Sequence, residues 1–210
     1  MKRHLNQVIR YVISFMILTG CHHTASSNPN EKLKDANTSF YFDIKKPGIL
    51  DLEIGQTKEF LTRNNFSFET KKFYTESGEE EMFRVNIDRA VFDLFFDEND
   101  RVREIVSSYE ELRDFYGNGV GTSLKKLKLN YPTGHFAVGL EEDKFANFVT
   151  PGHVIFVFDT EEFSDGCFTF PRQCAYDEND KNVVKIRISA FDFTDYLEEV
   201  RQKNQKGQSN

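Results

Sequence analysis

The 210-residue sequence has no tryptophan, only three cysteines and no apolar run of the length that crosses a membrane as a helix. Such a span needs about 20 residues, whereas the apolar stretch at residues 11–18 is much shorter. The sequence also lacks the G-x-S-x-G, H-E-x-x-H and P-loop motifs. The short apolar run excludes a conventional transmembrane helix at residues 11–18. The missing motifs mean that the sequence shows none of these catalytic signatures.

Positive charge is scarce as well. The 27 Lys and Arg residues face 34 Asp and Glu residues, for a formal net charge of -7. Nucleic-acid binding requires a basic face, and attraction to anionic lipid requires basic clusters, so neither partner is expected. Phenylalanine, by contrast, occurs 22 times, and side chains of that size can fill a real core. We therefore expect a folded body that needs no cofactor.

The first 21 residues have the order of a secretory signal. Lys2, Arg3 and Arg10 are positive, the apolar stretch follows, and small residues precede Cys21. The run Leu18-Thr19-Gly20-Cys21 resembles the lipobox of bacterial lipoproteins. The resemblance implies a signal peptide over residues 1–20 and acylation of Cys21, which would anchor the chain to a membrane through its N-terminal lipid. Removing the three positive residues would leave a net charge of -10. The alternatives are an ordinary secretion signal and an uncleaved anchor.

Residues 21–39 are small and polar, which is typical of a flexible tether. His22 and His23 lie in it, but two adjacent histidines in a flexible segment do not predict a metal site. The lipobox resemblance, with histidine rather than aspartate after the cysteine, implies the outer membrane. We therefore expect a lipid-anchored protein of the bacterial cell envelope that faces the periplasm.

The body contains an apparent internal repeat. Residues 54–64 align with residues 120–130: an aliphatic residue and glycine open each stretch, Thr57 or Ser123 can cap a short helix, and asparagine ends it. Further on, residues 91–107 align with residues 154–189, since both contain an apolar strand, an acidic turn and a second strand.

The acidic turns share the sequence Asp-Glu-Asn-Asp, at residues 97–100 and 177–180. Both lack the later ligands of an EF-hand calcium loop, so they are expected to be hairpin turns, in which Asn and Asp tolerate positive φ.

The repeat predicts an α+β fold of two tandem units, residues 40–116 and 117–200, packed as one sheet-based body. Each unit is expected to have a short helix followed by three antiparallel strands, because short turns favour antiparallel order. Strands are expected at residues 66–74 and, more weakly, 135–140. A short helix is expected at residues 191–200 and a polar tail at residues 201–210.

The aliphatic-Gly-x-Thr/Ser opening followed by a short helix and strands resembles the SmpA/OmlA-type outer-membrane lipoproteins. In tandem, such modules resemble the beta-lactamase inhibitor protein. The resemblance covers residues 54–107 and 120–189, and the cysteine placement departs from it. It implies a protein-binding scaffold without catalysis and identifies no partner.

The second unit carries an insertion, residues 160–176, with Cys167 and Cys174. In an oxidising compartment this pair predicts a disulfide; the spacing does not fit a C-x-x-C metal or redox pair. Three phenylalanines in the insertion, Phe163, Phe168 and Phe170, can either contact a partner or pack on the sheet.

Two functional hypotheses follow. The first is a non-enzymatic, lipid-anchored module that binds an envelope protein, for example an inhibitor or an immunity protein. The second is an envelope hydrolase or metal-binding enzyme, which would require His135 and His153 to converge with carboxylates. We expect the first, because the sequence contains no such constellation of motifs.

Overall fold

The computed structural model describes residues 40–75, 78–140, 144–171 and 174–207. The lipobox with Cys21, and the segment expected to be a tether, lie outside these residues. Within the described ranges, none of the helices combines the length and the apolar character that a membrane span requires. Buried apolar side chains between Phe40 and Ile188 form one hydrophobic cluster, so the described ranges contain a core of their own.

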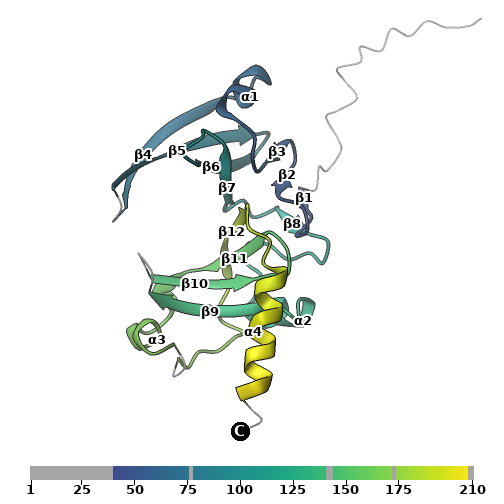
Figure 1. The fold of residues 1–210 in the computed structure, drawn as a ribbon, viewed down its shortest axis with the longest axis vertical. Coiled ribbons are helices and arrows are strands. Elements are labelled where there is room, and N and C mark those ends of the chain that lie inside the picture. The colour runs from purple at the N-terminus through teal and green to yellow at the C-terminus, as the bar shows by residue number, and fades with distance from the viewer. Residues whose placement is uncertain (1–39, 76–77, 141–143, 172–173, 208–210) are drawn as a thin grey trace, which may run out of the picture. The chain divides into compact units, whose positions relative to one another are not determined.

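In the described part of the chain, eight strands form one sheet in the order β4-β5-β6-β7-β12-β11-β10-β9 (Figure 1). Every neighbouring pair is antiparallel. This confirms the α+β class with an antiparallel sheet. The strands are β4 (Phe68–Thr75), β5 (Gly78–Ile87), β6 (Ala90–Phe96), β7 (Val102–Ser107), β9 (His135–Leu140), β10 (Lys144–Val149), β11 (Val154–Phe158) and β12 (Val183–Ser189).

One face of the sheet supplies the core. Along β6, Phe92 and Leu94 are buried while Val91 points to the exposed side, as the two-residue period of a strand requires. The same face of β11 and β10 contributes Phe156 and Phe148, which are fully buried. The large phenylalanine content of the sequence is therefore used mainly inside the body.

Two short helices, α1 (Lys58–Arg63) and α2 (Leu124–Asn130), contribute Leu61, Leu124 and Leu127 to this core. The Oγ atom of Thr57 accepts a hydrogen bond from the backbone N–H of Phe60, and Ser123 caps α2 through Lys126 in the same way. Both predicted helix caps are confirmed. Figure 1 shows α1 at the end of the sheet formed by β4 to β7, and α2 at the end formed by β9 to β12.

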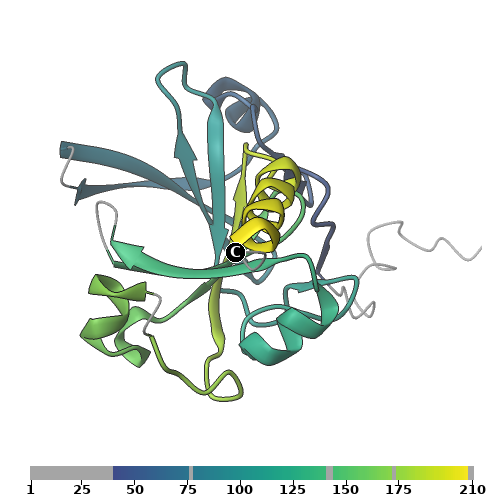
Figure 2. The ribbon, with the colours of Figure 1, turned by 60° about the horizontal axis from the view of Figure 1, so that its bottom comes forward.

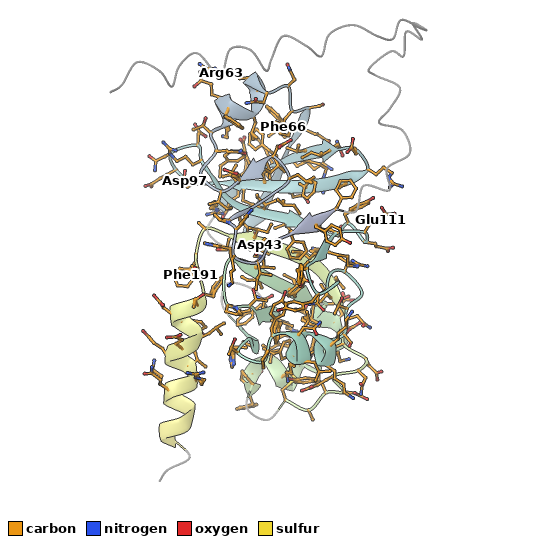
Figure 3. All side chains as sticks on the ribbon, turned by 90° about the vertical axis from the view of Figure 1, so that its right-hand side faces the viewer. Asp43, Arg63, Phe66, Asp97, Glu111 and Phe191 are labelled. Carbon is orange, nitrogen blue, oxygen red and sulfur yellow. A yellow bond between two sulfur atoms is a disulfide. The ribbon has the colours of Figure 1, made fainter. Side chains whose placement is uncertain are left out.

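Both acidic runs form turns. The run at residues 97–100 joins β6 to β7 as a hairpin, as expected, whereas the run at residues 177–180 lies in the longer connection between α3 (Asp165–Thr169) and β12. The carboxylate of Asp97 accepts hydrogen bonds from the backbone N–H groups of Asn99 and Arg101, and Asp177 accepts one from Asn179. Asp100 has a φ of 55°, a conformation that aspartate tolerates. Figure 3 shows Asp97 at this exposed turn and Phe66 among the side chains below α1.

Two strands and part of a helix depart from the sequence expectation. Neither β5 nor β10 was predicted. β5 begins with Gly78 and three glutamates, which have low strand propensity, and its pairing with β4 and β6 overrides this local signal. β10 does carry a local signal, because its buried residues Ala146 and Phe148 alternate with less buried ones. The last helix, α4 (Thr194–Gly207), follows β12 and continues well beyond residue 200 (Figure 2). The predicted polar tail is therefore helical as far as Gly207, because Arg, Gln and Lys are good helix formers.

Four short strands lie outside the large sheet. They form two small sheets, in which β1 (Tyr41–Phe42) pairs in parallel with β8 (Arg113–Asp114), and β2 (Gly48–Ile49) pairs with β3 (Leu52–Glu53). The β1–β8 pairing is the feature that positions the candidate site, because it places Tyr41 next to the turn that follows Asp114.

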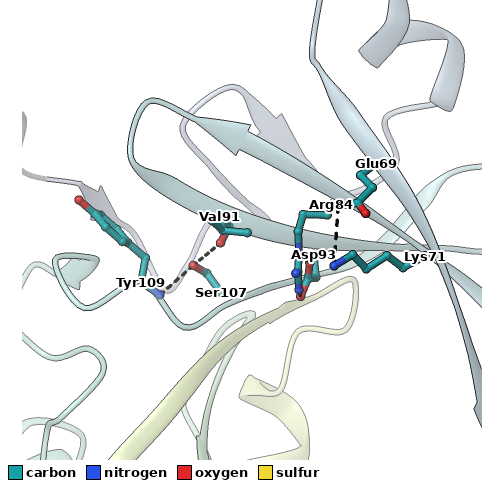
Figure 4. Close-up of polar contacts among 7 residues, drawn as sticks. All are labelled: Glu69, Lys71, Arg84, Val91, Asp93, Ser107 and Tyr109. Carbon is teal, nitrogen blue, oxygen red and sulfur yellow. Dashed lines mark hydrogen bonds and ion pairs between the residues drawn. The ribbon is translucent and has the colours of Figure 1, made fainter.

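Where β7 ends, the hydroxyl of Ser107 links the backbone of β6 to the segment that follows β7. Ser107 Oγ donates to the carbonyl of Val91 at 2.8 Å and accepts from the backbone N–H of Tyr109 at 3.2 Å (Figure 4). Ser107 is itself buried. The chain is thereby directed out of the sheet and towards β8.

Candidate functional site

Residues 114–118, which we call the aromatic turn, expose two neighbouring aromatic side chains. Phe115 is 90% exposed and Tyr116 is 55% exposed, and their rings meet edge to face at 5.7 Å between centroids. Tyr41 on β1 is 62% exposed. Large apolar side chains gain free energy from burial, so a phenylalanine held almost wholly in water is costly unless something covers it.

The aromatic turn is held by a buried carboxylate. Asp114 is 1% exposed. Its Oδ1 atom accepts hydrogen bonds from the backbone N–H groups of Tyr116 at 2.7 Å and Asn118 at 2.8 Å. Its Oδ2 atom accepts from the side-chain amide of Asn118 at 2.8 Å and from the hydroxyl of Tyr131. Four donors around one carboxylate hold the turn in one shape.

Tyr131 connects the turn to the core. Its hydroxyl donates to Asp114, and burial together with this hydrogen bond raises the pKa of Tyr131, so it remains a donor at physiological pH. Its ring lies edge to face with Tyr116 at 5.5 Å and against the buried Phe156 at 6.2 Å. A continuous series of rings thus leads from the exposed Phe115 to the centre of the body.

The end of α2 supports the same turn. The side-chain amide of Asn130 donates to the side-chain oxygen of Asn118 at 2.8 Å. The backbone adds two more bonds, from Asp114 N–H to the Asn118 carbonyl and from Gly117 N–H to the Asp114 carbonyl. Gly117 has a φ of 73°, which glycine adopts without strain. Residues 114–118 therefore form a tightly hydrogen-bonded turn.

Beside the aromatic turn lies an open surface depression with a volume of about 1310 Å³, which we call the groove. It is lined by residues 41–50, Glu53, residues 114–116, 130–133 and 151–152, and Asp192 and Thr194. Tyr41, Phe115 and Tyr116 all belong to this lining. The groove therefore lies next to Phe115 and Tyr41, the two most exposed aromatic side chains among those that the structure describes.

The structure brings Cys167 and Cys174 together as a disulfide, with their Cα atoms 4.4 Å apart. Cys167 and two of the three phenylalanines that were candidates for partner contact, Phe163 and Phe168, are buried in the core cluster. These two cannot serve as partner contacts: their side chains pack inward from the 3-10 turn η1 (Thr160–Glu162) and the helix α3 (Asp165–Thr169). Phe170, at 58% exposure, remains accessible.

The two histidines of the body have different surroundings. His135 is partly buried, and burial, together with the positive charge of Lys128, lowers its pKa. His153 Nδ1 lies 3.1 Å from the Ser189 carbonyl, and its Nε2 lies 3.9 Å from a carboxylate oxygen of Asp192. In the part of the chain that the structure describes, no three His, Cys, Asp or Glu side chains gather in a way that could hold a metal ion.

The sheet face opposite the core carries a row of charges. Glu69, Arg84 and Asp93 are direct neighbours across β4, β5 and β6, and Arg84 binds Asp93 through two hydrogen bonds of 2.7 and 2.9 Å (Figure 4). On β7 and β12, Glu104 pairs with Arg187 at 3.3 Å. Cross-strand pairs of opposite charge stabilise a sheet, so we interpret this row as structural.

Among the carboxyl groups of that row, Glu104 is the one whose pKa is shifted. Its burial raises the pKa, while Arg187 and Arg103 act in the opposite direction. The Nε atom of Arg187 is buried without a hydrogen-bond partner, although it lies close to Glu104. The pair is thus an ion pair in partly desolvated surroundings, where the burial cost of the Glu104 charge exceeds the attraction of the two arginines.

The aromatic turn was not predicted from the sequence. Its signal is the order Asp114-Phe115-Tyr116-Gly117-Asn118, in which turn-forming residues flank two large aromatics. Aspartate and glycine predict the turn, and aromatic side chains in a tight turn cannot all be buried. That combination could have been found, whereas the pairing with Tyr41 depends on tertiary structure.

Comparison with known proteins adds little to this description. No family model matches the sequence, and no curated protein is significantly similar to it. Among solved structures, the chain is similar to the crystal structure of the uncharacterized protein yfeY from Escherichia coli, with a TM-score of 0.46 and 11% sequence identity, over 72% of this chain and 99% of that chain.

Proposed function

We propose that the chain is a lipid-anchored lipoprotein of the bacterial cell envelope that binds another protein and catalyses no reaction. The lipid on Cys21 anchors it in the outer membrane, and residues 21–39 tether a body that faces the periplasm. An inhibitor or immunity role falls within this class. The observation that carries the binding function is the exposure of Phe115 on a turn fixed by a buried carboxylate.

The body consists, in this proposal, of two tandem copies of one unit, residues 40–116 and 117–200. The strand order supports it, since β4 to β7 and β9 to β12 meet at the β7–β12 pair and run outward in the same sequence on both sides. The caps support it as well, since Thr57 precedes α1 as Ser123 precedes α2.

The connection between each helix and its last strand adds further support. Gly55 donates its backbone N–H to the carbonyl of Val102 at 2.7 Å, and Gly121 donates to Val183 at the same distance. The two glycines have φ values of 88° and 84°. Equivalent positive φ values and equivalent bonds at aligned positions are what two copies of one unit would have.

A protein partner is favoured by the composition of the exposed surface. Aromatic residues are enriched at the centres of protein interfaces, and a few of them carry most of the binding free energy. Phe115, Tyr116 and Tyr41 form such a centre, and charged residues surround it. A turn that is already ordered loses little conformational entropy on binding.

Site-specific photo-crosslinking in intact cells tests this function. A photoreactive phenylalanine analogue at position 115 should give a discrete protein adduct. The same analogue at position 129 is the matched control, because Leu129 is 73% exposed and does not line the groove. Tyr116→Ala should weaken the adduct at position 115. No adduct at position 115, or the same adducts at both positions, would contradict the proposal.

Fractionation tests the anchor separately. Cys21→Ser removes the acylated sulfur, so the variant should lose the lipid mass and leave the membrane fraction. Stable anchoring by lipid depends on the acyl chains. A variant that stays in the membrane fraction with an unchanged mass would show that the lipobox reading is wrong, without affecting the binding surface.

A further inference from the structure

The lining of the groove is rich in carboxylates. Asp43, Glu53 and Asp192 are exposed, and Asp114 lies buried below the aromatic turn. Two cations, Lys45 and Lys46, are the remaining charged residues of the lining. Four carboxylates against two amines give the groove an excess of negative charge, with the same sign as the net charge of -7 of the whole chain.

Aromatic rings from two segments of the chain line this acidic surface. Tyr41 comes from β1, and Phe115 and Tyr116 come from the aromatic turn after β8. The parallel pairing of Tyr41 with Arg113 brings the two segments together. Aromatic faces attract ammonium and guanidinium groups, and carboxylates add direct hydrogen bonds to the same cations.

The size of the groove favours a polypeptide over a small molecule. Pockets for small ligands have volumes of about 300–1,000 Å³ and enclose most of the ligand, whereas this groove measures about 1310 Å³ and is open. An extended chain rises about 3.3 Å per residue, so several residues can lie along such a surface with alternate side chains against it.

We propose that the groove binds an extended basic segment of the partner protein, with arginine or lysine side chains between Tyr41 and the aromatic turn. This inference rests on the proposed protein-binding function and specifies the chemistry of the partner. The guanidinium or ammonium groups lie against the exposed rings and pair with Asp43 and Asp192. The negative charge of the body steers such a segment towards the groove.

Lys45 and Lys46 give the proposal a distinctive consequence. Their ammonium groups line the groove and oppose an incoming cation. Replacing both by glutamine should therefore tighten binding of a basic segment, by about two- to five-fold for exposed charges. A groove that selects an anion would respond in the opposite direction.

The test is a titration of the isotopically labelled chain, from residue 22 onwards, followed by backbone amide NMR. The body has a core of its own, so it is suitable for solution work without the signal segment. The probe is an alternating glycine–arginine hexapeptide, and the matched control probe replaces each arginine with uncharged citrulline. Saturable shifts are expected at Tyr41, Asp43, Phe115 and Tyr116 with the arginine peptide, and none with citrulline.

Variants then locate the contact. Phe115→Ala should weaken binding about two- to five-fold through loss of one exposed cation–π contact, and Leu129→Ala should leave it unchanged. Shifts confined to the acidic turns at residues 97–100 or 177–180 would show non-specific attraction and overturn the inference. Binding of a glutamate peptide in place of the arginine peptide would overturn it too.

The two proposals fail separately. If crosslinking at position 115 yields a specific protein adduct but the arginine peptide causes no saturable shifts, the protein-binding function stands and the basic-segment inference is wrong. If neither signal is seen, both are wrong. Saturable shifts without a crosslinked protein would support the chemistry of the groove and contradict its use for binding a protein in the cell.

Discussion

Asp114→Ala tests whether the buried carboxylate holds the aromatic turn. The substitution removes the acceptor of four hydrogen bonds, two from backbone N–H groups and two from the side chains of Asn118 and Tyr131. Hydrogen bonds to a charged group contribute about 1.5–3 kcal/mol each. The simple sum is an overestimate, because the backbone groups regain water when the turn frays.

We therefore expect a loss of about 3–5 kcal/mol in the free energy of unfolding, the range seen when one partner of a buried charged network is removed. For a body of this size, that corresponds to a decrease in Tm of about 10 °C. Urea unfolding monitored by far-UV circular dichroism measures the free energy, and a thermal scan gives Tm.

Two further variants sharpen this test. Asp114→Asn keeps one carbonyl oxygen for the two backbone donors but places an amide group opposite the side-chain amide of Asn118. The free energy of unfolding should therefore decrease by a smaller amount, about 1–3 kcal/mol. Asp51→Ala is the control, because Asp51 is exposed and such substitutions change stability by about 0.5 kcal/mol or less. If Asp114→Ala is no more destabilising than Asp51→Ala, the carboxylate does not organise the turn.

Three other predictions follow from the body. Burial raises the pKa of Glu104 above its ordinary value of 4.5, so the wild type should lose stability as pH rises from 4.5 through the raised pKa. Above that range Glu104→Gln should be more stable than the wild type in urea unfolding, and an equal pH dependence of the two proteins would contradict this. Replacing Cys167 and Cys174 with serine removes the disulfide and should lower the free energy of unfolding by at most about 2–3 kcal/mol. The sheet signal in circular dichroism should remain, and loss of all structure would contradict this prediction. Thr57→Ala and Ser123→Ala should each lower the free energy of unfolding by about 1 kcal/mol. A large difference between the two losses in chemical unfolding would argue against two equivalent units.

The local signals in the sequence predicted well the elements that local chemistry determines. Thr57 and Ser123 cap helices because each has an extended backbone, from which its side-chain oxygen accepts a hydrogen bond from one of the first free N–H groups of the helix. The two Asp-Glu-Asn-Asp runs form turns for similarly local reasons. The strand ending in Ser189 was predicted because its apolar residues alternate.

The remaining features depend on tertiary structure, which no local pattern specifies. β5 begins with glutamates, and its strand conformation follows from pairing with β4 and β6. Phe168 is buried and Phe170 exposed although they are two residues apart in one insertion. The groove combines residues from β1, the aromatic turn and the segment after β12, so its existence could not be read from any single stretch.

The central pairing of the sheet also affects how the body can form. β7 joins β12 through pairs such as Ile105 with Ile188 and Ser107 with Ile186, so strands about 80 residues apart in the sequence must meet. Contacts of such long separation slow folding, because the entropy of closing the loop is lost before the contact forms. Until Ser189 has been synthesised, β7 and β11 each present an unpaired edge, and exposed strand edges promote aggregation. A nascent chain of this protein should therefore be vulnerable to misassembly until β12 has been synthesised, and a truncation before β12 should aggregate instead of yielding a folded half.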